Sequence, residues 1–349
     1  MKKIYVYPFS DEVLNILDNK DMLKDFEIVG VINDNKSVGE LLTNKYGCLS
    51  VDNEILDDNQ YFRNIDGVML YSDGFSNMGK NKYIDFIVEK IIKYEKEIFF
   101  TNELKKYIDC FDYTKKTLID YYAQDNIDLS QYELKYIDKP VILIMGLGEN
   151  CDKTRVGLSL YKFFKNEGYK PSIVSSNSLD KLIGFNTFSF LNNNFNDEVK
   201  RYNYMLSRIN MDENPDLLIV VAPSGVVKHD NRNNNLFGYP SYVITSAITP
   251  DITILSVYAG KYDIENINYL KNICYYKYNS RLSYIHIART VCDMNLETNK
   301  LDYLQIDDVD AMKYLIEDDL SMYSTMDHNS TNKIHSMILE ELRGNVKQI

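Results

Sequence analysis

The sequence predicts an α/β protein with two domains, each built around a parallel β-sheet. Short β-rich runs alternate with amphipathic helical patterns over about the first 110 residues, which is typical of βαβ units. The alternation restarts after Pro140 with the run VILIMG, a glycine-containing turn and a helical pattern. The chain has 349 residues, and single hydrophobic cores stop growing at about 250–300 residues. We expect a Rossmann-like or flavodoxin-like domain at 1–135 and a P-loop-NTPase-like domain at 136–349.

The first domain is expected to contain four strands and at least two helices. The strand candidates are IYVYPF, FEIVGVIND, GVMLYSD and EIFFTN. Residues 11–19 and 82–96 have helical patterns, and in the second of these the apolar residues share one face: Ile84, Ile87, Val88, Ile91 and Ile92. Residues 104–128 are also expected to be helical. The polar stretch that follows, up to Pro140, predicts the domain boundary.

The second domain repeats the strand and helix pattern. Strands are expected at 141–146, 171–177, 216–223, 242–246 and 251–259. Helices are expected at 154–167, 198–210 and 331–343, and the first and last of these are followed by Gly168 and Gly344. Parallel strands are the simplest arrangement for this order of elements.

Composition excludes several classes of protein. The net charge of −12 opposes non-specific binding to nucleic acid, and no apolar run approaches the roughly 20 residues needed to cross a bilayer. The N-terminal sequence MKKIYVYPFSDEV lacks the apolar stretch of a signal peptide. Five scattered cysteines without a CxxC pair fit a reducing compartment and free thiols. We expect a cytoplasmic protein that binds neither nucleic acid nor membrane.

The segment GLGENCDKT at 146–154 resembles a phosphate-binding loop. It follows a strand and opens a helix, where backbone amides and the helix dipole favour an anion. In the pattern GxxxxGK[ST], the lysine reaches the outer phosphates and the hydroxyl binds magnesium. Lys153 and Thr154 occupy these two places. The expected phosphate cradle, for ATP or GTP with Mg²⁺, consists of Gly146, Gly148, Asn150, Cys151, Asp152, Lys153 and Thr154.

The loop departs from the usual pattern in two ways. Asp152 stands where the second glycine belongs and Leu147 where the first belongs, so that Gly146 and Gly148 flank the expected position. The Asp152 carboxylate would repel a phosphate unless it points outward. The same residues also fit a tight strand-to-helix turn with a solvated Lys153. A dinucleotide fingerprint fits less well, because Cys151 replaces its third glycine.

A second strand usually accompanies such a loop and ends in a magnesium-orienting aspartate, often as DxxG. The matching strand reads DLLIVVAPSG, with Ala222 in place of the carboxylate and Gly225 in place. We therefore expect slow hydrolysis at most, with Ser224 and Gly225 as further contacts at the strand's end. His229 with Asp230, Asp180 and Asp251 are read as loop, cap or turn residues, and no metal is expected beyond the nucleotide's magnesium.

Four segments together resemble one bacterial family: GLGENCDK, GFNTFSF, ENPDLLIVVAPSGV and FGYPSYVITSAITPD. They are similar to the peptide maturation system proteins of clostridial clusters for ribosomally made, modified peptides. The likeness covers most of the second domain and, more faintly, the first. It implies an accessory role beside a precursor peptide or a peptide-modifying enzyme, on a nucleotide-binding type of fold, and it implies no particular reaction.

The sequence thus supports two functions of different classes. The first is an ATP- or GTP-binding accessory protein in peptide maturation, with little hydrolysis. The alternative is a non-enzymatic scaffold that has lost nucleotide binding and holds a peptide or a modifying enzyme between its domains; Ala222 and Asp152 motivate it. A first-domain oxidoreductase ranks last, because no glycine fingerprint follows IYVYPF. Catalysis and assembly into a homo-oligomer stay open.

Overall fold

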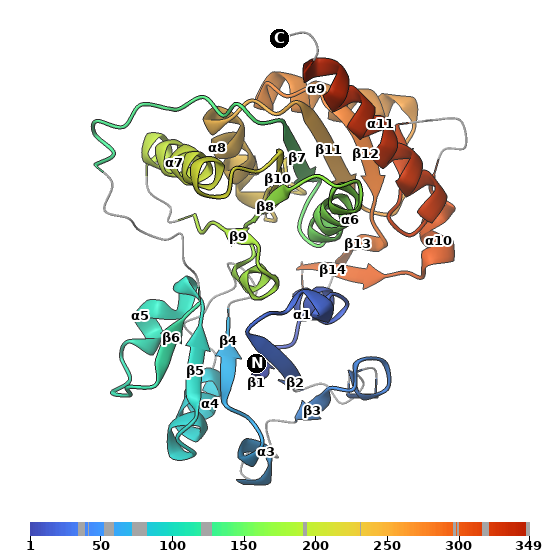
Figure 1. Cartoon of the computed structure of the whole chain (residues 1–349). Coiled ribbons are helices and arrows are strands. Elements are labelled where there is room, and N and C mark those ends of the chain that lie inside the picture. Colours follow the sequence, from blue (N-terminus) through green and yellow to red (C-terminus); the bar gives the residue numbers. More distant parts are fainter. Residues whose placement is uncertain are drawn as a thin grey trace. The chain divides into compact units, whose positions relative to one another are not determined.

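The structure is a computed structural model, and its chain divides into two compact units (Figure 1). The first unit comprises 1–125 and 177–189, and the second comprises 126–176 and 190–349. Within these units the structure describes residues 1–33, 39–40, 42–51, 59–71, 82–119, 128–190, 194–230, 232–295, 298, 300–315 and 321–346.

The first unit contains a six-stranded parallel sheet in the order β3-β2-β1-β4-β5-β6. Its strands are β1 (Lys2–Tyr7), β2 (Phe26–Ile32), β3 (Leu49–Val51), β4 (Gly67–Leu70), β5 (Glu97–Phe100) and β6 (Lys116–Leu118). Strand β4 is fully buried, which is expected where helices cover both faces of a parallel sheet. The predicted parallel sheet of this part of the chain is confirmed.

Helices of the first unit pack on this sheet through apolar faces. They are α1 (Asp11–Leu17), α3 (Asn59–Arg63), α4 (Lys82–Lys93) and α5 (Lys105–Ile108), with the short 3₁₀ or π-helical segments η1 (Lys20–Met22), η2 (Leu42–Tyr46), η5 (Asn102–Leu104) and η6 (Ser178–Ile183). The Ser10 hydroxyl caps α1 by accepting from the Glu12 amide. In α4 the predicted apolar face is confirmed, because Ile87, Val88 and Ile91 are inaccessible to solvent.

The helix expected over 104–128 is wrong for the residues that the structure describes. Helix α5 ends at Ile108, and Lys116–Leu118 form the edge strand β6 beside β5; 120–127 lie outside the described residues. Between α5 and β6, Phe111 and Tyr113 pack against the apolar core of the first unit from a non-helical segment. Pairing with β5 gives the β6 backbone its hydrogen bonds instead.

The second sheet has seven strands in the order β15-β12-β11-β7-β10-β8-β9, and all of them except β9 belong to the second unit. Its strands are β7 (Val141–Gly146), β8 (Pro171–Ser175), β9 (Asn186–Thr187), β10 (Leu217–Val221), β11 (Ile252–Val257), β12 (Leu282–Ile287) and β15 (Met322–Tyr323). Strand β7 is central and parallel to β10 and β11, with Ile144 opposite both Val221 and Ile254. A separate antiparallel ribbon joins β13 (Thr290–Asn295) to β14 (Lys300–Gln305).

The helices of the second unit cover both faces of its sheet (Figure 1). They are α6 (Lys153–Asn166), α7 (Phe195–Glu213), α8 (Tyr239–Ala247), α9 (Ile264–Tyr278), α10 (Asp308–Met312) and α11 (His328–Val346), with the short turn η7 (Asn235–Gly238) before α8. Helices α7, α8 and α9 pack in a row. Helix α6 packs on β8 and β10, and its Phe163 ring lies 5.2 Å from the His335 ring of α11.

The strand expected at 242–246 is wrong, because these residues belong to helix α8. The run YVITS is rich in β-branched residues, yet Val243 and Ile244 are buried together with Pro240 and Ala247, at the spacing of one helix face. Pro240 stands in the first turn of the helix, where its missing N–H costs nothing, and Gly238 precedes it with a left-handed backbone. Tertiary packing and this start signal outweigh the strand propensity of the side chains.

The sheet order places one loop in a favoured position for ligands. From β7 the chain goes to β8 on one side, and later, from β10, it passes to β11 on the other side of β7. With right-handed crossovers the connecting helices α6 and α8 then lie on opposite faces. A crevice opens outside the carboxyl ends of the strands at such a point. The loop 147–152, which follows β7, stands there.

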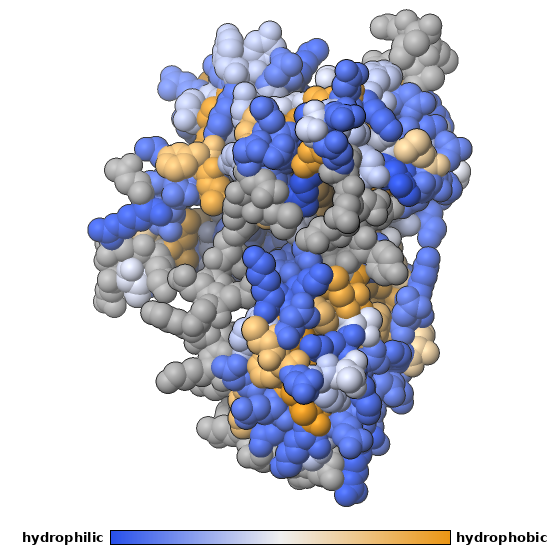
Figure 2. All heavy atoms as spheres, turned by 90° about the vertical axis from the view of Figure 1, so that its left-hand side faces the viewer, coloured by the Kyte–Doolittle hydropathy of each residue, from blue (hydrophilic) through white to orange (hydrophobic). Residues whose placement is uncertain are grey.

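Among the helices of the described residues, none combines the length and the apolar character that a bilayer crossing requires. On the face that Figure 2 draws, hydrophilic residues predominate and hydrophobic ones form small separate patches.

Candidate functional site

The loop between β7 and α6 has a backbone that suits an anion. Asn150 and Asp152 both adopt left-handed conformations, with φ of 53° and 55°, and Asp152 is followed directly by the right-handed helix. A left-handed residue beside a right-handed one turns successive N–H groups toward a common point. The Asp152 side chain does not cap the helix. The amide end of a 14-residue helix therefore opens at this loop without a side-chain cap.

The Asp152 carboxylate points away from this amide end. Its Oδ2 accepts from the Arg289 backbone N–H at 2.9 Å. Its Oδ1 lies 3.9 Å from Arg155 Nε and 3.8 Å from Arg289 Nε. Two guanidinium groups thus neutralise the charge that would repel a phosphate, because opposite charges at this range attract strongly in a partly desolvated site.

Lys153 joins the loop after β7 to the loop after β10. Its Nζ donates to the Gly148 carbonyl at 2.8 Å and to the Ser224 carbonyl at 2.7 Å. Its Cδ lies only 2.6 Å from where a Cβ on Gly146 would be, so the lysine stem crosses directly over the end of β7. The ammonium group is therefore held over the loop rather than extended into solvent.

Three glycines make this close packing possible. A Cβ on Gly148 would lie 2.1 Å from the Tyr258 hydroxyl, and one on Gly225 would lie 2.5 Å from the Leu147 carbonyl oxygen. Such distances are closer than any side chain tolerates, and in the case of Gly225 the obstacle is backbone. Gly146, Gly148 and Gly225 thus serve close approach between loops, which explains glycines that do not follow the usual spacing.

The loop after β10 supplies backbone and hydroxyl groups but no carboxylate at the strand's end. Ser224 has a left-handed backbone, with φ of 58°, and its hydroxyl donates to the Asn235 carbonyl at 2.9 Å. Ala222, directly after β10, is fully buried. The methyl group stands where phosphate-loop nucleotidases carry a magnesium-orienting carboxylate, so the residues here fit phosphate binding better than metal-assisted hydrolysis.

Cys151 and Tyr258 hold the middle of the loop. The Tyr258 hydroxyl donates to the Glu149 carbonyl at 2.7 Å, and the Gly148 amide donates to the Cys151 sulfur at 3.4 Å. Burial raises the pKa of the Cys151 thiol to about 11, so the group is a protonated packing residue and not a nucleophile at neutral pH. Its predicted place in the cradle is structural, since the sulfur bonds the loop itself.

A buried hydrogen-bond chain, which the sequence did not predict, supports the loop through the Cys151 carbonyl. The Thr325 amide donates to His286 Nε2 at 3.1 Å, so the ring proton is on Nδ1, 2.7 Å from the Ser256 hydroxyl. Ser256 in turn donates to the Cys151 carbonyl. Burial, followed by the charge of Arg155, lowers the pKa of His286 to about 3, which keeps the ring neutral. The sequence alternation does not reveal this role, because His286 is buried only where helices cover both faces of the sheet.

The remaining candidates lie away from the loop or have other partners. The Asp230 carboxylate accepts from the amides of Arg232 and Asn233, and these bonds lower its pKa to about 2. The Asp251 carboxylate accepts from the Val141 amide at the opposite end of β7. Asp180 belongs to η6 in the first unit. Their interpretation as turn and cap residues agrees with these contacts.

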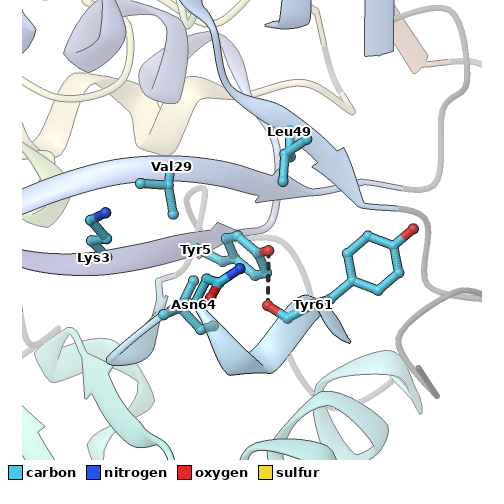
Figure 3. Close-up of a pocket in the computed structure, with 7 residues that line it drawn as sticks. Lys3, Tyr5, Val29, Leu49, Tyr61 and Asn64 are labelled. Carbon is cyan, nitrogen blue, oxygen red and sulfur yellow. Dashed lines mark hydrogen bonds between the residues drawn. The ribbon is translucent and has the colours of Figure 1, made fainter. Parts of the chain in front are cut away.

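The first unit has a cavity of about 480 Å³ between β1, β2, β3 and α3 (Figure 3). The Tyr5 hydroxyl donates to the Tyr61 carbonyl across it, at 2.9 Å. Lys3 and Leu49 lie at or near the amino ends of β1 and β3, away from the carboxyl ends where parallel sheets bind ligands. The loop 147–152 therefore remains the candidate site.

Comparison with known proteins shows the fold. No protein-family model matches the chain, and no curated protein matches it. A DUF1611 family protein from Anabaena variabilis is 12% identical, with 82% of this chain and 88% of that chain covered and a TM-score of 0.58. The chain is also matched, at a TM-score of 0.29, by a nucleotide-binding protein in complex with ADP from Archaeoglobus fulgidus, 13% identical over 56% of this chain and 85% of that one. The signal recognition particle 54 kDa protein from Aeropyrum pernix in complex with GDP is 14% identical and has a TM-score of 0.26. The match covers 76% of this chain and 55% of that chain.

The likeness to the Anabaena protein extends over most of both chains, so the two proteins share an α/β fold. At this identity it indicates the fold alone. The two nucleotide complexes have TM-scores too low to support an argument.

Proposed function

We propose that this protein binds ATP or GTP with Mg²⁺ at the loop 146–154 and acts as an accessory protein in the maturation of a ribosomally synthesised peptide. One observation supports the nucleotide most strongly: Lys153 lies over an uncapped helix start while the neighbouring Asp152 carboxylate faces two arginines. This is the charge distribution that a phosphate group requires. The work would take place in the cytoplasm.

Each group at the loop has a defined role toward the nucleotide. The amides at Asp152 and Thr154 donate to a phosphate, and Lys153 exchanges its two carbonyl partners for phosphate oxygens. The Thr154 hydroxyl offers the oxygen ligand that magnesium prefers. Bound Mg²⁺ would neutralise phosphate charge. Ser224 and Gly225 shape the opposite wall of the loop through their backbone.

Hydrolysis is a minor part of the proposal. The buried Ala222 supplies no carboxylate to orient magnesium or water. The nucleotide then acts by binding, as a switch or as a stabiliser of the loop, with turnover that is slow at most.

Isothermal titration with MgATP and MgGTP tests nucleotide binding. Lys153→Ala is expected to weaken binding at least about tenfold, because a charge-assisted hydrogen bond contributes about 1.5–3 kcal/mol. Lys162→Ala removes an exposed lysine from the same helix and is expected to bind like the wild type. No heat with either nucleotide would remove the proposal.

The peptide role rests on the resemblance carried by GLGENCDK and the three further segments. The scaffold alternative draws support from Ala222, since a protein that only holds a peptide needs no magnesium-orienting carboxylate. A pull-down with a leader peptide, with and without nucleotide, separates the two. Equal retention of the peptide with and without nucleotide, and by the wild type and Lys153→Ala, favours the scaffold.

A further inference from the structure

The ribbon β13–β14 has one face against the candidate site and one face outward. Strand residues alternate between faces, so Cys292 and Tyr303 share one face and Asp293 and Asp302 share the other. Cys292 and Tyr303 pack against Tyr258, whose hydroxyl holds the Glu149 carbonyl of the loop. The ribbon therefore packs on Tyr258, the side chain that holds the phosphate loop in place.

The outward face carries an unfavourable pair of charges. Asp293 and Asp302 are directly opposite in the register, and both are exposed. Like charges in this relation destabilise a ribbon. Leu304, on the same face, is 61% exposed. A cationic, partly apolar partner would relieve the repulsion and cover the leucine.

The backbone edge of β14 is available for pairing. The Ile306 amide donates to the Arg289 carbonyl, so these two opposite residues form a hydrogen-bonded pair. Hydrogen-bonded and non-hydrogen-bonded pairs alternate along an antiparallel ladder. Leu301, Tyr303 and Gln305 therefore direct their N–H and C=O groups away from β13. The Thr290 carbonyl at the other edge already accepts from the Ala259 amide. Within the part of the chain that the structure describes, the ribbon sheet has two strands and no third.

We propose that β14 binds an extended peptide segment as a third strand, with a basic side chain opposite Asp302 on the face that carries Asp293 and Asp302. Main-chain hydrogen bonds to β14 supply affinity, and the two carboxylates, which lie at one position of the ladder, select a lysine or arginine opposite Asp302. This inference rests on the proposed function, because it gives the chemistry of its peptide partner. It also places the peptide on the ribbon whose other face packs on Tyr258, beside the phosphate loop.

Fluorescence anisotropy with a labelled peptide of alternating lysine and threonine tests the proposal on the full chain. We expect saturable binding that weakens as salt is raised, since exposed charges are screened. A peptide of alternating glutamate and threonine should not bind. The lysine peptide with N-methyl groups on alternate amides should lose binding, because it keeps its charge but cannot form the ladder. Binding of the N-methylated peptide at equal strength would overturn strand addition.

Two variants of the protein distinguish the contribution of the carboxylates from that of the backbone hydrogen bonds. Asp293→Asn with Asp302→Asn should weaken binding about fivefold, the size expected for two exposed ion pairs. Glu167→Gln with Glu265→Gln removes two exposed carboxylates elsewhere and should have no effect beyond the small change in net charge. Leu301→Pro removes one outward N–H while it spares the ladder to β13, so it should abolish binding in a protein that melts like the wild type.

Nucleotide titration of the same samples keeps the two proposals distinct. The asparagine variant should bind MgATP or MgGTP like the wild type, and Lys153→Ala should bind the peptide like the wild type when no nucleotide is present. Peptide binding without nucleotide binding would remove the nucleotide proposal and leave the ribbon site. Failure of the wild type to bind the lysine peptide, or equal binding by the asparagine variant, overturns the ribbon site.

Discussion

Gly148 is the residue at which the loop after β7 is most tightly enclosed. Gly148→Ala would place a methyl group 2.1 Å from the Tyr258 hydroxyl and break the bond from that hydroxyl to Glu149. We expect a loss of about 1–3 kcal/mol in the free energy of unfolding, measured with urea, because overpacked sites relax only partly. Nucleotide binding should weaken as well.

Gly344→Ala is the matched control for this change. Gly344 lies in α11, and a Cβ there would meet nothing within 4 Å. The free energy of unfolding should stay equal or rise by up to about 1 kcal/mol, as expected for alanine in place of helical glycine. Equal behaviour of the two variants would contradict the close approach described for Gly148.

Ser256 connects the buried His286 to the carbonyl of Cys151. Ser256→Ala leaves both partners without this bond and should cost about 1–3 kcal/mol of unfolding free energy. Ser280→Ala breaks a buried hydroxyl pair with Thr253 near the other end of β11 and should cost a similar amount. Only Ser256→Ala should lower nucleotide affinity in titration. An equal effect of both on affinity would assign Ser256 a purely structural role.

Much of the site at residue scale follows from the sequence, and some of it does not. The positions of Lys153 and Thr154 after a buried strand predict the loop directly. The orientation of Asp152 does not follow, because Arg289 is 137 residues away in the chain. The contact between Gly148 and Tyr258 also depends on the strand order, which places β11 beside β7.

At the scale of elements, α6, β12 and α11 meet at two buried histidines. Burial, with the charge of Arg155, lowers the pKa of His286 to about 3, and burial with the neighbouring His286 lowers that of His335 to about 4. An unfolded histidine binds a proton near pH 6.5. The stabilising effect of the neutral rings is therefore complete above pH 6.5 and is lost as the pH falls toward the folded values. Each histidine should lower the unfolding free energy by about 1.4 kcal/mol per pH unit in that range.

His335→Phe isolates one part of this pH dependence. The His335 Nε2 is buried, and the described residues provide it with no hydrogen-bond partner, so phenylalanine loses no bond there. It also suits the aromatic contact with Phe163. Urea unfolding between pH 7.5 and 5 should show a slope for the variant that is shallower by about 1.4 kcal/mol per pH unit. An unchanged slope would show that His335 does not contribute.

The elements that the sequence predicts best are those with strong periodicity. The buried runs 141–146 and 217–221 and the apolar face of α4 all follow from pattern alone. Short or mixed patterns are predicted worst. Helix α8 has strand-like composition, and β6 has three residues whose only reason to be extended is the neighbouring β5.

At the scale of the whole molecule, the chain enters the first unit twice. Segment 177–189 is grouped with 1–125, where Ser178 and Ser189 both donate to Glu103 and where η6 packs on α1. Nothing in the order of the sequence indicates this return, because the contacts join residues more than seventy positions apart. The boundary predicted at 135 stays a prediction.

All residues assigned to the nucleotide site belong to the second unit. A chain of 126–349 in which a glycine-serine linker of equal length replaces 177–189 should therefore bind nucleotide with nearly the affinity of the full chain. Circular dichroism would check that it folds, and titration would measure the affinity. A folded but inactive fragment would mean that the first unit contributes to the site.

The central claim is that the amide end of α6 binds a phosphate group. A crystal structure with a magnesium-bound, non-hydrolysable ATP or GTP analogue tests it most directly. We predict phosphate oxygens against the amides of Asp152 and Thr154, with Lys153 Nζ moved from the Gly148 and Ser224 carbonyls onto the phosphate. An empty loop at saturating nucleotide, with Lys153 still on both carbonyls, would contradict the account.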